Sequence, residues 1–416
     1  MKKINIFLII LLLSGMTVFA QTPDLSIFWE EYNRSNATVI EMLGVLQAVR
    51  DENVTGIGSF YLDAIRVFNQ RLPNFSSYGD RLAVEELSRL LFRGLAAEKY
   101  TDAAPYIWHL LHYFDISFRP NDGILMYEAI IALGEINAQN YVVPIATFLE
   151  EYNERGSADP LTKSIMQVVV PGTITALETL GNAAGIRPIF FASIGWYDNN
   201  LKAIASTSLV NLMNKLGDTI GEIIIGIITD LFNNPFVKNA AWQEFLKTTT
   251  VSKEVKAKVA AAALEASYTF ITSSRESLAI LRIMRVTAIE KMREVGIADD
   301  AEYAFLERTY REAFEAPNTD FETIILVVRT LTAVNTEESI SLLTEFLRGL
   351  HNRKRSGPWG STERDLMSII ISAISTTGTQ SRTTIQLLTV IQNSSIYTMA
   401  EQTWARNALA TLARSR

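Results

Sequence analysis

The chain has 416 residues, a net charge of −7, and 48% apolar residues. This acidic balance argues against nucleic acid or an anionic membrane surface as the main partner. The absence of cysteine excludes disulfides, thiolate catalysis, thiolate metal sites and a lipid-modified cysteine anchor. Only 21 glycines and 11 prolines interrupt the chain, so its composition favours long helices.

The first twenty residues have the pattern of a secretory signal peptide. Lysines at positions 2 and 3 are followed by an apolar run at 4–13, and Val18-Phe19-Ala20 supplies small residues for a peptidase. The apolar run is shorter than the roughly 20 residues that a spanning helix needs. We therefore expect cleavage after Ala20 and a periplasmic or secreted mature chain with no integral membrane span.

Apolar residues recur at helical spacing through the next hundred residues. Residues 21–60 are expected to be helical and to cap a helical array, with a turn at 55–58. Segments 84–95 and 104–114 predict a helical hairpin, whose second helix opens at Pro105.

Residues 126–152 predict two helices joined by a polar turn at 137–140. The first ends in Ala-Leu-Gly-Glu-Ile at 132–136, and Pro144 begins the second, where its missing N–H costs nothing. This combination resembles a HEAT repeat. The resemblance implies an all-α fold, namely an α-solenoid of antiparallel helix pairs that presents a concave face to a protein or peptide partner.

Internal matches support repetition. A shift of 44 residues places 132–133 on 176–177 and 144–145 on 188–189, within the HEAT range of about 40–47 residues. Other units lack the glycine of the motif, which leaves HEAT, armadillo and tetratricopeptide-like arrays open.

A second offset of about 198 residues, the length of several such repeats, aligns two longer segments. It matches Pro120-Asn121 with Pro317-Asn318, Asn137 with Asn335, and Pro160 with Pro358. Helical periodicity alone would not align these loop positions, although any two helical arrays share apolar spacing. The chain is then divided into five parts. They are a signal peptide at 1–20, a cap with the first hairpins at 21–117, a first copy of one module at 118–214, a central helical segment at 215–313 and a second copy of the module at 314–416.

The central segment contributes three predicted helices. Residues 218–232 are very apolar but are interrupted by two acids, so they predict a buried helix rather than a membrane span. Residues 255–270 are alanine-rich and helical. One further amphipathic face is marked by Leu281, Met284, Ala288, Met292 and Val295.

Few residues have the pattern of a catalytic, cofactor or metal site, and none is assigned to one. His109 and His112 lie three apart and with Asp115 could hold a metal, but their aromatic neighbours favour packing or a surface position. His351 is the only other histidine, which leaves few options for a histidine-based triad.

The most distinctive segment is expected to be a loop at 352–360. Arg353, Lys354 and Arg355 precede Trp359 there and could recognise a carboxylate, a phosphate or an acidic peptide of a partner. The alternative is a solvated loop whose tryptophan packs back onto the helices.

These patterns favour an exported, non-enzymatic scaffold or adaptor that binds a protein or peptide in the cell envelope. The alternative is an envelope hydrolase of polysaccharide or peptide built on a helical array. A glycosidase would need a pocket with two carboxylates about 5–9.5 Å apart.

Overall fold

The computed structural model consists of helices and turns throughout the part of the chain that it describes. The predicted all-α fold class is therefore confirmed. The described part comprises residues 25–414 except positions 53, 76, 78, 117–121, 157, 299, 317–318, 358 and 380. The expected signal peptide and several of the aligned loop residues lie outside it: 1–20, Pro120-Asn121, Pro317-Asn318 and Pro358.

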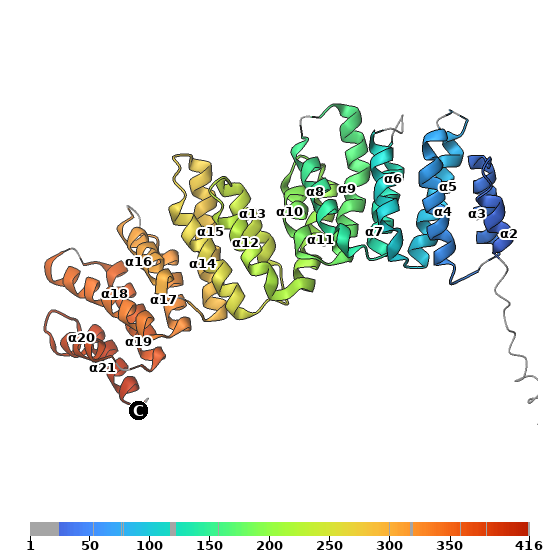
Figure 1. Ribbon diagram of the computed structural model, residues 1–416. Coiled ribbons are helices and arrows are strands. Elements are labelled where there is room, and N and C mark those ends of the chain that lie inside the picture. Colours follow the sequence, from blue (N-terminus) through green and yellow to red (C-terminus); the bar gives the residue numbers. More distant parts are fainter. Residues whose placement is uncertain are drawn as a thin grey trace, which may run out of the picture. The chain divides into compact units, whose positions relative to one another are not determined.

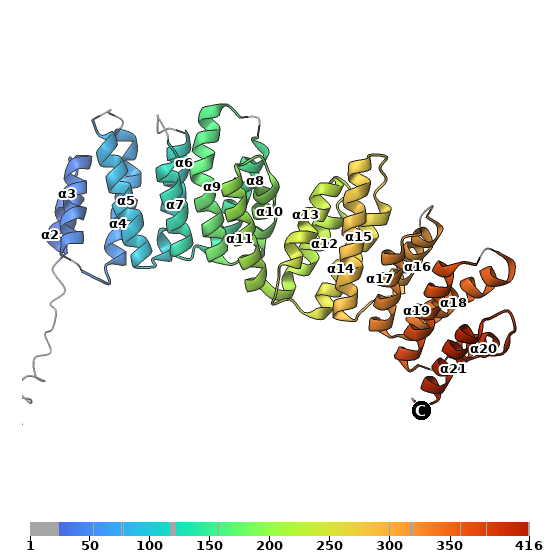
Figure 2. The ribbon, with the colours of Figure 1, turned by 180° about the vertical axis from the view of Figure 1, so that it is seen from behind.

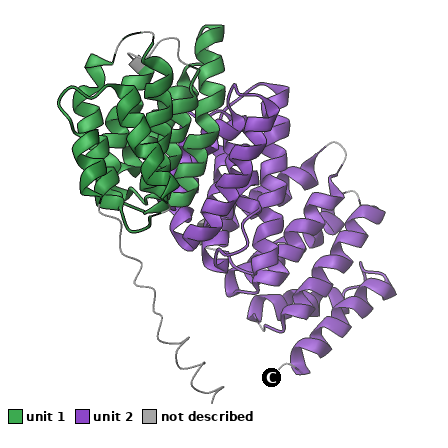
Figure 3. Ribbon diagram, turned by 90° about the vertical axis from the view of Figure 1, so that its right-hand side faces the viewer, with its two compact units in different colours: residues 1–180 green, residues 181–416 purple. Residues whose placement is uncertain are grey.

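The helices form two compact units, residues 1–180 and 181–416, called unit 1 and unit 2 (Figure 3). Unit 1 contains α2 Ser26–Tyr32, α3 Val39–Asp51, α4 Gly58–Arg71, α5 Arg81–Ala97, α6 Ala104–Ile116, α7 Ile124–Glu135, α8 Val142–Glu154 and α9 Pro160–Leu180. Unit 2 begins with α10 Ile186–Ile194, α11 Asn199–Leu216, α12 Gly221–Thr229, α13 Pro235–Leu246, α14 Lys253–Thr269 and α15 Arg275–Val295. It continues with α16 Asp300–Glu315, α17 Phe321–Val334, α18 Glu337–Ser356, α19 Ser361–Thr377, α20 Arg382–Asn393 and α21 Met399–Arg414.

The boundary between the units falls inside the segment 118–214, which the sequence analysis assigns to the first module copy. The proposed duplication remains a prediction. One short 3-10 turn, Leu72–Asn74, directly follows α4. Others directly precede α6, α8, α10 and α12, namely Thr101–Ala103, Gln139–Tyr141, Ala183–Gly185 and Gly217–Ile220.

Within each unit, a helix packs mainly on its neighbours in sequence and on the helix two places along (Figures 1 and 2). In unit 1, α3, α5, α7 and α9 contact one another in this order. In unit 2, one row runs from α11 through α13, α15, α17 and α19 to α21, and a second runs from α12 through α14, α16 and α18 to α20. Each unit is therefore a stack of hairpins that bury their apolar stripes against the next hairpin.

The pairing of helices in unit 1 differs from the one expected from sequence. Helix α7 packs on α6, α5 and α9, and α8 packs on α9. The hairpins are therefore α6 with α7 and α8 with α9. The segment 126–152 contains one helix of each, and its polar turn connects the two hairpins. In the same way, α5 packs on α4 and α7, and α6 packs on α4 and α7. Apolar spacing locates each helix but does not reveal which neighbour covers its stripe.

Small residues at the end of α7 allow a close approach to α9. A Cβ atom added to Gly134 would lie 3.0 Å from the Cα atom of Ala176. Ala132, Leu133 and Ala176 are all buried at this contact. The Ala-Leu-Gly motif and the alanine 44 residues later therefore act together, as the two facing sides of one helix crossing.

Asn137 and Asn335, which the long offset aligns, share an unusual backbone conformation. Their φ angles are 58° and 53°, in the left-handed region that asparagine tolerates better than most residues. Asn137 follows α7 and Asn335 follows α17, where their backbone N–H groups bond to carbonyl oxygens in the last helical turn. Both asparagines thus provide the left-handed residue at a helix end, Asn335 directly after α17 and Asn137 one residue beyond Ile136, which follows α7.

The helices expected in the central segment are present, with one correction. The five apolar positions predicted for the face of α15 are all buried. The apolar run 218–232 forms a 3-10 turn and α12, in which Ile220, Ile224 and Ile227 are buried. The buried helix ends earlier than expected, at Thr229, and Leu231 and Phe232 beyond it are almost fully exposed. The chain turns there to reach Pro235, which starts α13.

None of the helices in the described ranges is both long and apolar enough to cross a membrane.

Candidate functional site

The basic run is not a loop, because α18 continues through it to Ser356. Arg353, Lys354 and Arg355 occupy its last turn, where positive side chains are stabilised by the unpaired carbonyl groups of the helix end. Arg355 is exposed, whereas Arg353 bonds to Glu363 at 3.3 Å and lies over the ring of Phe314. Arg353 therefore already has partners within unit 2, and so does Lys354.

Lys354 forms a buried ion pair with Glu401 of α21. Its Nζ atom lies 2.6 and 2.7 Å from the carboxylate oxygens, and the exposed fractions of the two side chains are 8% and 0%. Trp359 is half-buried, and its ring centroid lies 4.4 Å from the Lys354 Nζ. Its Nε1 is buried and has no hydrogen-bond partner among the described residues. The cation thus joins the end of α18 to the start of α21.

The carboxyl of Glu401 is held in its ionised form. Burial by itself would raise its pKa, but hydrogen bonds from the Lys354 ammonium and from the backbone and hydroxyl of Thr398 outweigh burial and lower the pKa. An unpaired buried charge would destabilise the fold. The pairing of Lys354 with Glu401 therefore holds α18 against α21 within unit 2. Whether Arg355 and its neighbours also bind a partner stays a prediction.

The histidines lie on one helix, as their spacing predicts, but do not gather metal ligands. His109 and His112 are exposed on α6, and the ring of His112 packs against Trp108 with centroids 4.8 Å apart. Within the described ranges, no three histidine or acidic side chains are placed to hold a metal ion. His351 stacks on Tyr397, and its Nδ1 shares a hydrogen bond with the tyrosine hydroxyl.

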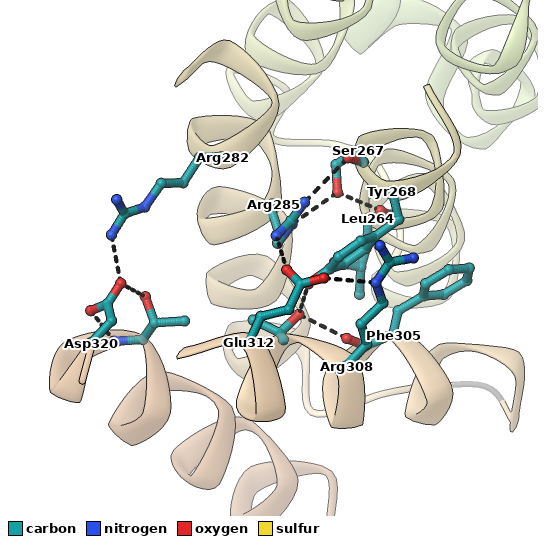
Figure 4. A network of polar contacts seen from close by, with 11 residues as sticks. Leu264, Ser267, Tyr268, Arg282, Arg285, Phe305, Arg308, Glu312 and Asp320 are labelled. Atoms are coloured by element: carbon teal, nitrogen blue, oxygen red, sulfur yellow. Dashed lines mark hydrogen bonds and ion pairs between the residues drawn. The ribbon is translucent and has the colours of Figure 1, made fainter. Parts of the chain in front are cut away.

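A groove lies in unit 2, between the end of α14 and helices α15, α16 and α17. We call it the arginine groove. Its volume is about 620 Å³. Three arginines line it: Arg282 and Arg285 from α15, and Arg308 from α16. Figure 4 shows Arg285 and Arg308 in one network of polar contacts and Arg282 to one side of it. Glu312 and Asp320 are the carboxylates among its lining residues.

Tyr268 and Glu312 organise two of the arginines (Figure 4). The Glu312 carboxylate accepts from Arg285 Nη1 at 3.0 Å and from Arg308 Nε at 2.8 Å. The guanidinium carbons of Arg285 and Arg308 lie 3.5 and 4.4 Å from the centroid of the Tyr268 ring. Cation–π attraction and a shared carboxylate therefore hold two like charges side by side.

Tyr268 is itself fixed by its neighbours. Its hydroxyl shares a hydrogen bond of 2.7 Å with Thr309, and its ring stacks on Phe305. Burial raises the pKa of Tyr268, so the phenol stays protonated at neutral pH. Arg285 also donates to the carbonyl of Ser267 at 3.3 Å. Contacts within unit 2 thus fix Tyr268 and Arg285 at the inner wall of the groove.

The other arginine, Arg282, is more loosely held. Its Nη2 atom lies 2.5 Å from an oxygen of Asp320, which also caps the start of α17 through Thr323. Burial would raise the pKa of Asp320, but bonds from Thr323 and Arg282 outweigh it and lower the pKa. The general acid of an inverting or retaining glycosidase needs the opposite shift. The lowered pKa of Asp320 therefore does not match that of such an acid.

The groove continues along α15 and α17 into a second hollow of about 420 Å³. The two hollows share Arg282, Val286, Asp320 and Thr323. The continuation adds two further arginines and two glutamates: Arg293, Arg329, Glu290 and Glu322. A ligand with an extended shape could therefore follow α15 for much of its length.

The apolar part of the first hollow comes from the turn after α14 and from the start of α15. Ile271 is 97% exposed and Leu278 is 50% exposed, and both line the groove. A groove with cationic and apolar walls can bind a ligand that carries a negative charge beside an apolar group.

The sequence analysis did not single out these residues. Arg282 and Arg285 are three apart on α15, and Arg308 and Glu312 are four apart on α16, so each pair shares a helical face. That spacing was visible in the sequence. What was not visible is that α14, α15 and α16 bring Tyr268 and both pairs together.

Comparison with known proteins finds no matching family model, no matching curated protein and no matching solved structure.

Proposed function

We propose that this protein is an exported, non-enzymatic adaptor of the HEAT-like solenoid type, whose unit 2 binds a protein or peptide partner in the cell envelope. The observation that carries the proposal is the arginine groove. It combines guanidinium groups with an exposed apolar wall, and hot spots of protein interfaces are enriched in arginine and aromatic side chains.

The stacked hairpins support the same proposal. Within each unit, the described hairpins pack mainly on their neighbours, so the faces between the turns can carry binding residues. Tyr268 and Arg285 are held in place by bonds within unit 2 before any partner arrives. Pre-organised side chains lose less conformational entropy on binding, which favours affinity.

Export is part of the proposal and rests on the sequence of residues 1–20. Sequencing the N-terminus of the chain isolated from its source cells tests it. A mature chain that begins at Gln21, recovered from the envelope or the medium, is expected. A chain that keeps residues 1–20 and fractionates with the cytoplasm would contradict this part.

Site-specific cross-linking in intact source cells tests partner binding. A photoreactive phenylalanine analogue replaces Leu278 in the groove or, as a control, Val390 on α20, which has a similar exposure of 48%. We expect one or a few proteins to be captured reproducibly at position 278 and not at 390. Equal labelling at both positions, or none at 278, would contradict an adaptor role for the groove.

A further inference from the structure

The arginine groove has more cationic than anionic groups, in a chain whose net charge is negative. Its first hollow contains three arginines against Glu312 and Asp320, while the whole chain carries −7. The excess of arginine in the first hollow therefore attracts an acidic ligand, whereas the net charge of the chain as a whole is unfavourable to one. This contrast favours one binding location and disfavours the others.

The two outer arginines have hydrogen-bonding capacity left for a ligand. The side chains of Arg282 and Arg308 are 68% and 55% exposed. The described residues provide each of them with one hydrogen-bonded carboxylate partner. A guanidinium has five N–H donors and can bind a carboxylate through two of them at once. An incoming carboxylate can thus bind without first displacing the internal one.

The apolar wall limits the kind of anion. Ile271 projects almost completely into solvent at the edge of the groove, and Leu278 stands half-exposed beside it. A free inorganic anion would leave both uncovered. A peptide with leucine or phenylalanine next to glutamate or aspartate would cover them while its carboxylates reach Arg282 and Arg308.

We propose that the arginine groove binds an acidic, apolar peptide segment of the partner, with its carboxylates on Arg282 and Arg308 and its apolar side chains on Ile271 and Leu278. This inference rests on the proposed adaptor function and adds the chemistry of the ligand. The continuation of the groove towards Arg293 and Arg329 provides room for further residues of the segment.

Fluorescence anisotropy of the full mature chain tests the inference. The probe is a short fluorescein-labelled peptide that alternates glutamate and leucine. Two comparison peptides replace every glutamate by glutamine or every leucine by serine. We expect the parent peptide to bind about tenfold or more tightly than either comparison peptide, since a hydrogen bond to a charged group and the burial of an apolar side chain each contribute about this much.

Matched variants locate the binding. The double variant R282Q/R308Q is expected to weaken binding of the parent peptide about tenfold or more, and I271S to weaken it less. The control is R348Q, because Arg348 of α18, whose side chain is 42% exposed, pairs with Glu345 away from the groove. Circular dichroism and thermal melting check that each variant is folded.

Three outcomes would overturn the inference: equal binding of the glutamate and glutamine peptides, equal loss in R348Q and R282Q/R308Q, or competition by inorganic phosphate as strong as by the unlabelled peptide. The last would identify a simple anion site. A protein captured at position 278 whose capture survives R282Q/R308Q would keep the adaptor function and reject the acidic ligand. Failure of the capture itself would instead reject the adaptor function.

Discussion

Unit 2 holds two clusters of basic residues that the chain uses in opposite ways. At the end of α18, Lys354 is buried against Glu401 and packed on Trp359. In the arginine groove, Arg282 and Arg308 remain more than half exposed. Three consecutive basic residues attract attention in a sequence, yet here the central one stabilises the fold. The arginines that face a groove are separated along the chain and meet only through helix packing.

Removing the buried cation should have the largest effect. Lys354→Met leaves the Glu401 carboxylate buried without its main partner, and we expect a loss of about 3–5 kcal/mol of local stability. Hydrogen–deuterium exchange of α18 and α21 measures this effect, because stability in a stacked array is local. The variant K354M/E401Q removes both charges and should recover part of the loss. Unchanged exchange in K354M would show that the pair is not needed for packing.

Acid should reproduce part of this effect without any mutation. The folded-state pKa of Glu401 is lower than its ordinary value of 4.5. The pair therefore contributes its full stability above that ordinary value and loses it as the pH falls through the lower folded-state pKa. Urea unfolding followed at several pH values below neutrality should show a smaller acid loss in K354M/E401Q than in the unaltered chain. Equal acid loss in both would assign it to other carboxylates.

The basic run can be tested for partner binding without breaking the fold. The variant R353Q/R355Q keeps Lys354 in its ion pair. If the run contributes to binding, as the sequence predicts, we expect capture of the partner to weaken up to about fivefold, the range of exposed charge pairs. Quantitative cross-linking at position 278 measures the change, and unchanged capture would reject a role for these two arginines.

The groove arginines should matter least for stability. Their ion pairs are exposed, so R282Q/R308Q is expected to change the free energy of unfolding of unit 2 by less than about 1 kcal/mol per pair. Thermal melting and hydrogen exchange of α15 and α16 measure it. A destabilisation as large as that of K354M would remove the contrast between the two clusters and would assign Arg282 and Arg308 to the fold.

The sequence predicted helices better than contacts. The face of α15, marked by Leu281, Met284 and three further residues, is buried as its spacing predicts. Spacing fixes a stripe because 3.6 residues make one turn. It does not say which neighbour covers the stripe, and so the pairing of α7 with α8 was wrong. The role of Gly134 in the contact between α7 and α9 becomes clear only from the structure, in which Ala176 lies opposite it.

The candidate groove could be predicted only in part. The pairs on α15 and α16 follow from spacing, but Tyr268 and Asp320 come from helix ends, whose positions depend on the turns between helices. In contrast, the run at 353–355 was easy to find and difficult to interpret. Its burial against Glu401 depends on α21, 47 positions along the chain.

The packing of each hairpin mainly on its neighbours has an evolutionary consequence. A hairpin at the end of unit 2, such as α20 with α21, contacts mainly the hairpin before it. Its loss or duplication therefore exposes or covers a single junction and leaves the remaining cores as they were. A gene for such a chain can lengthen or shorten by whole hairpins while the residues of one groove are inherited intact.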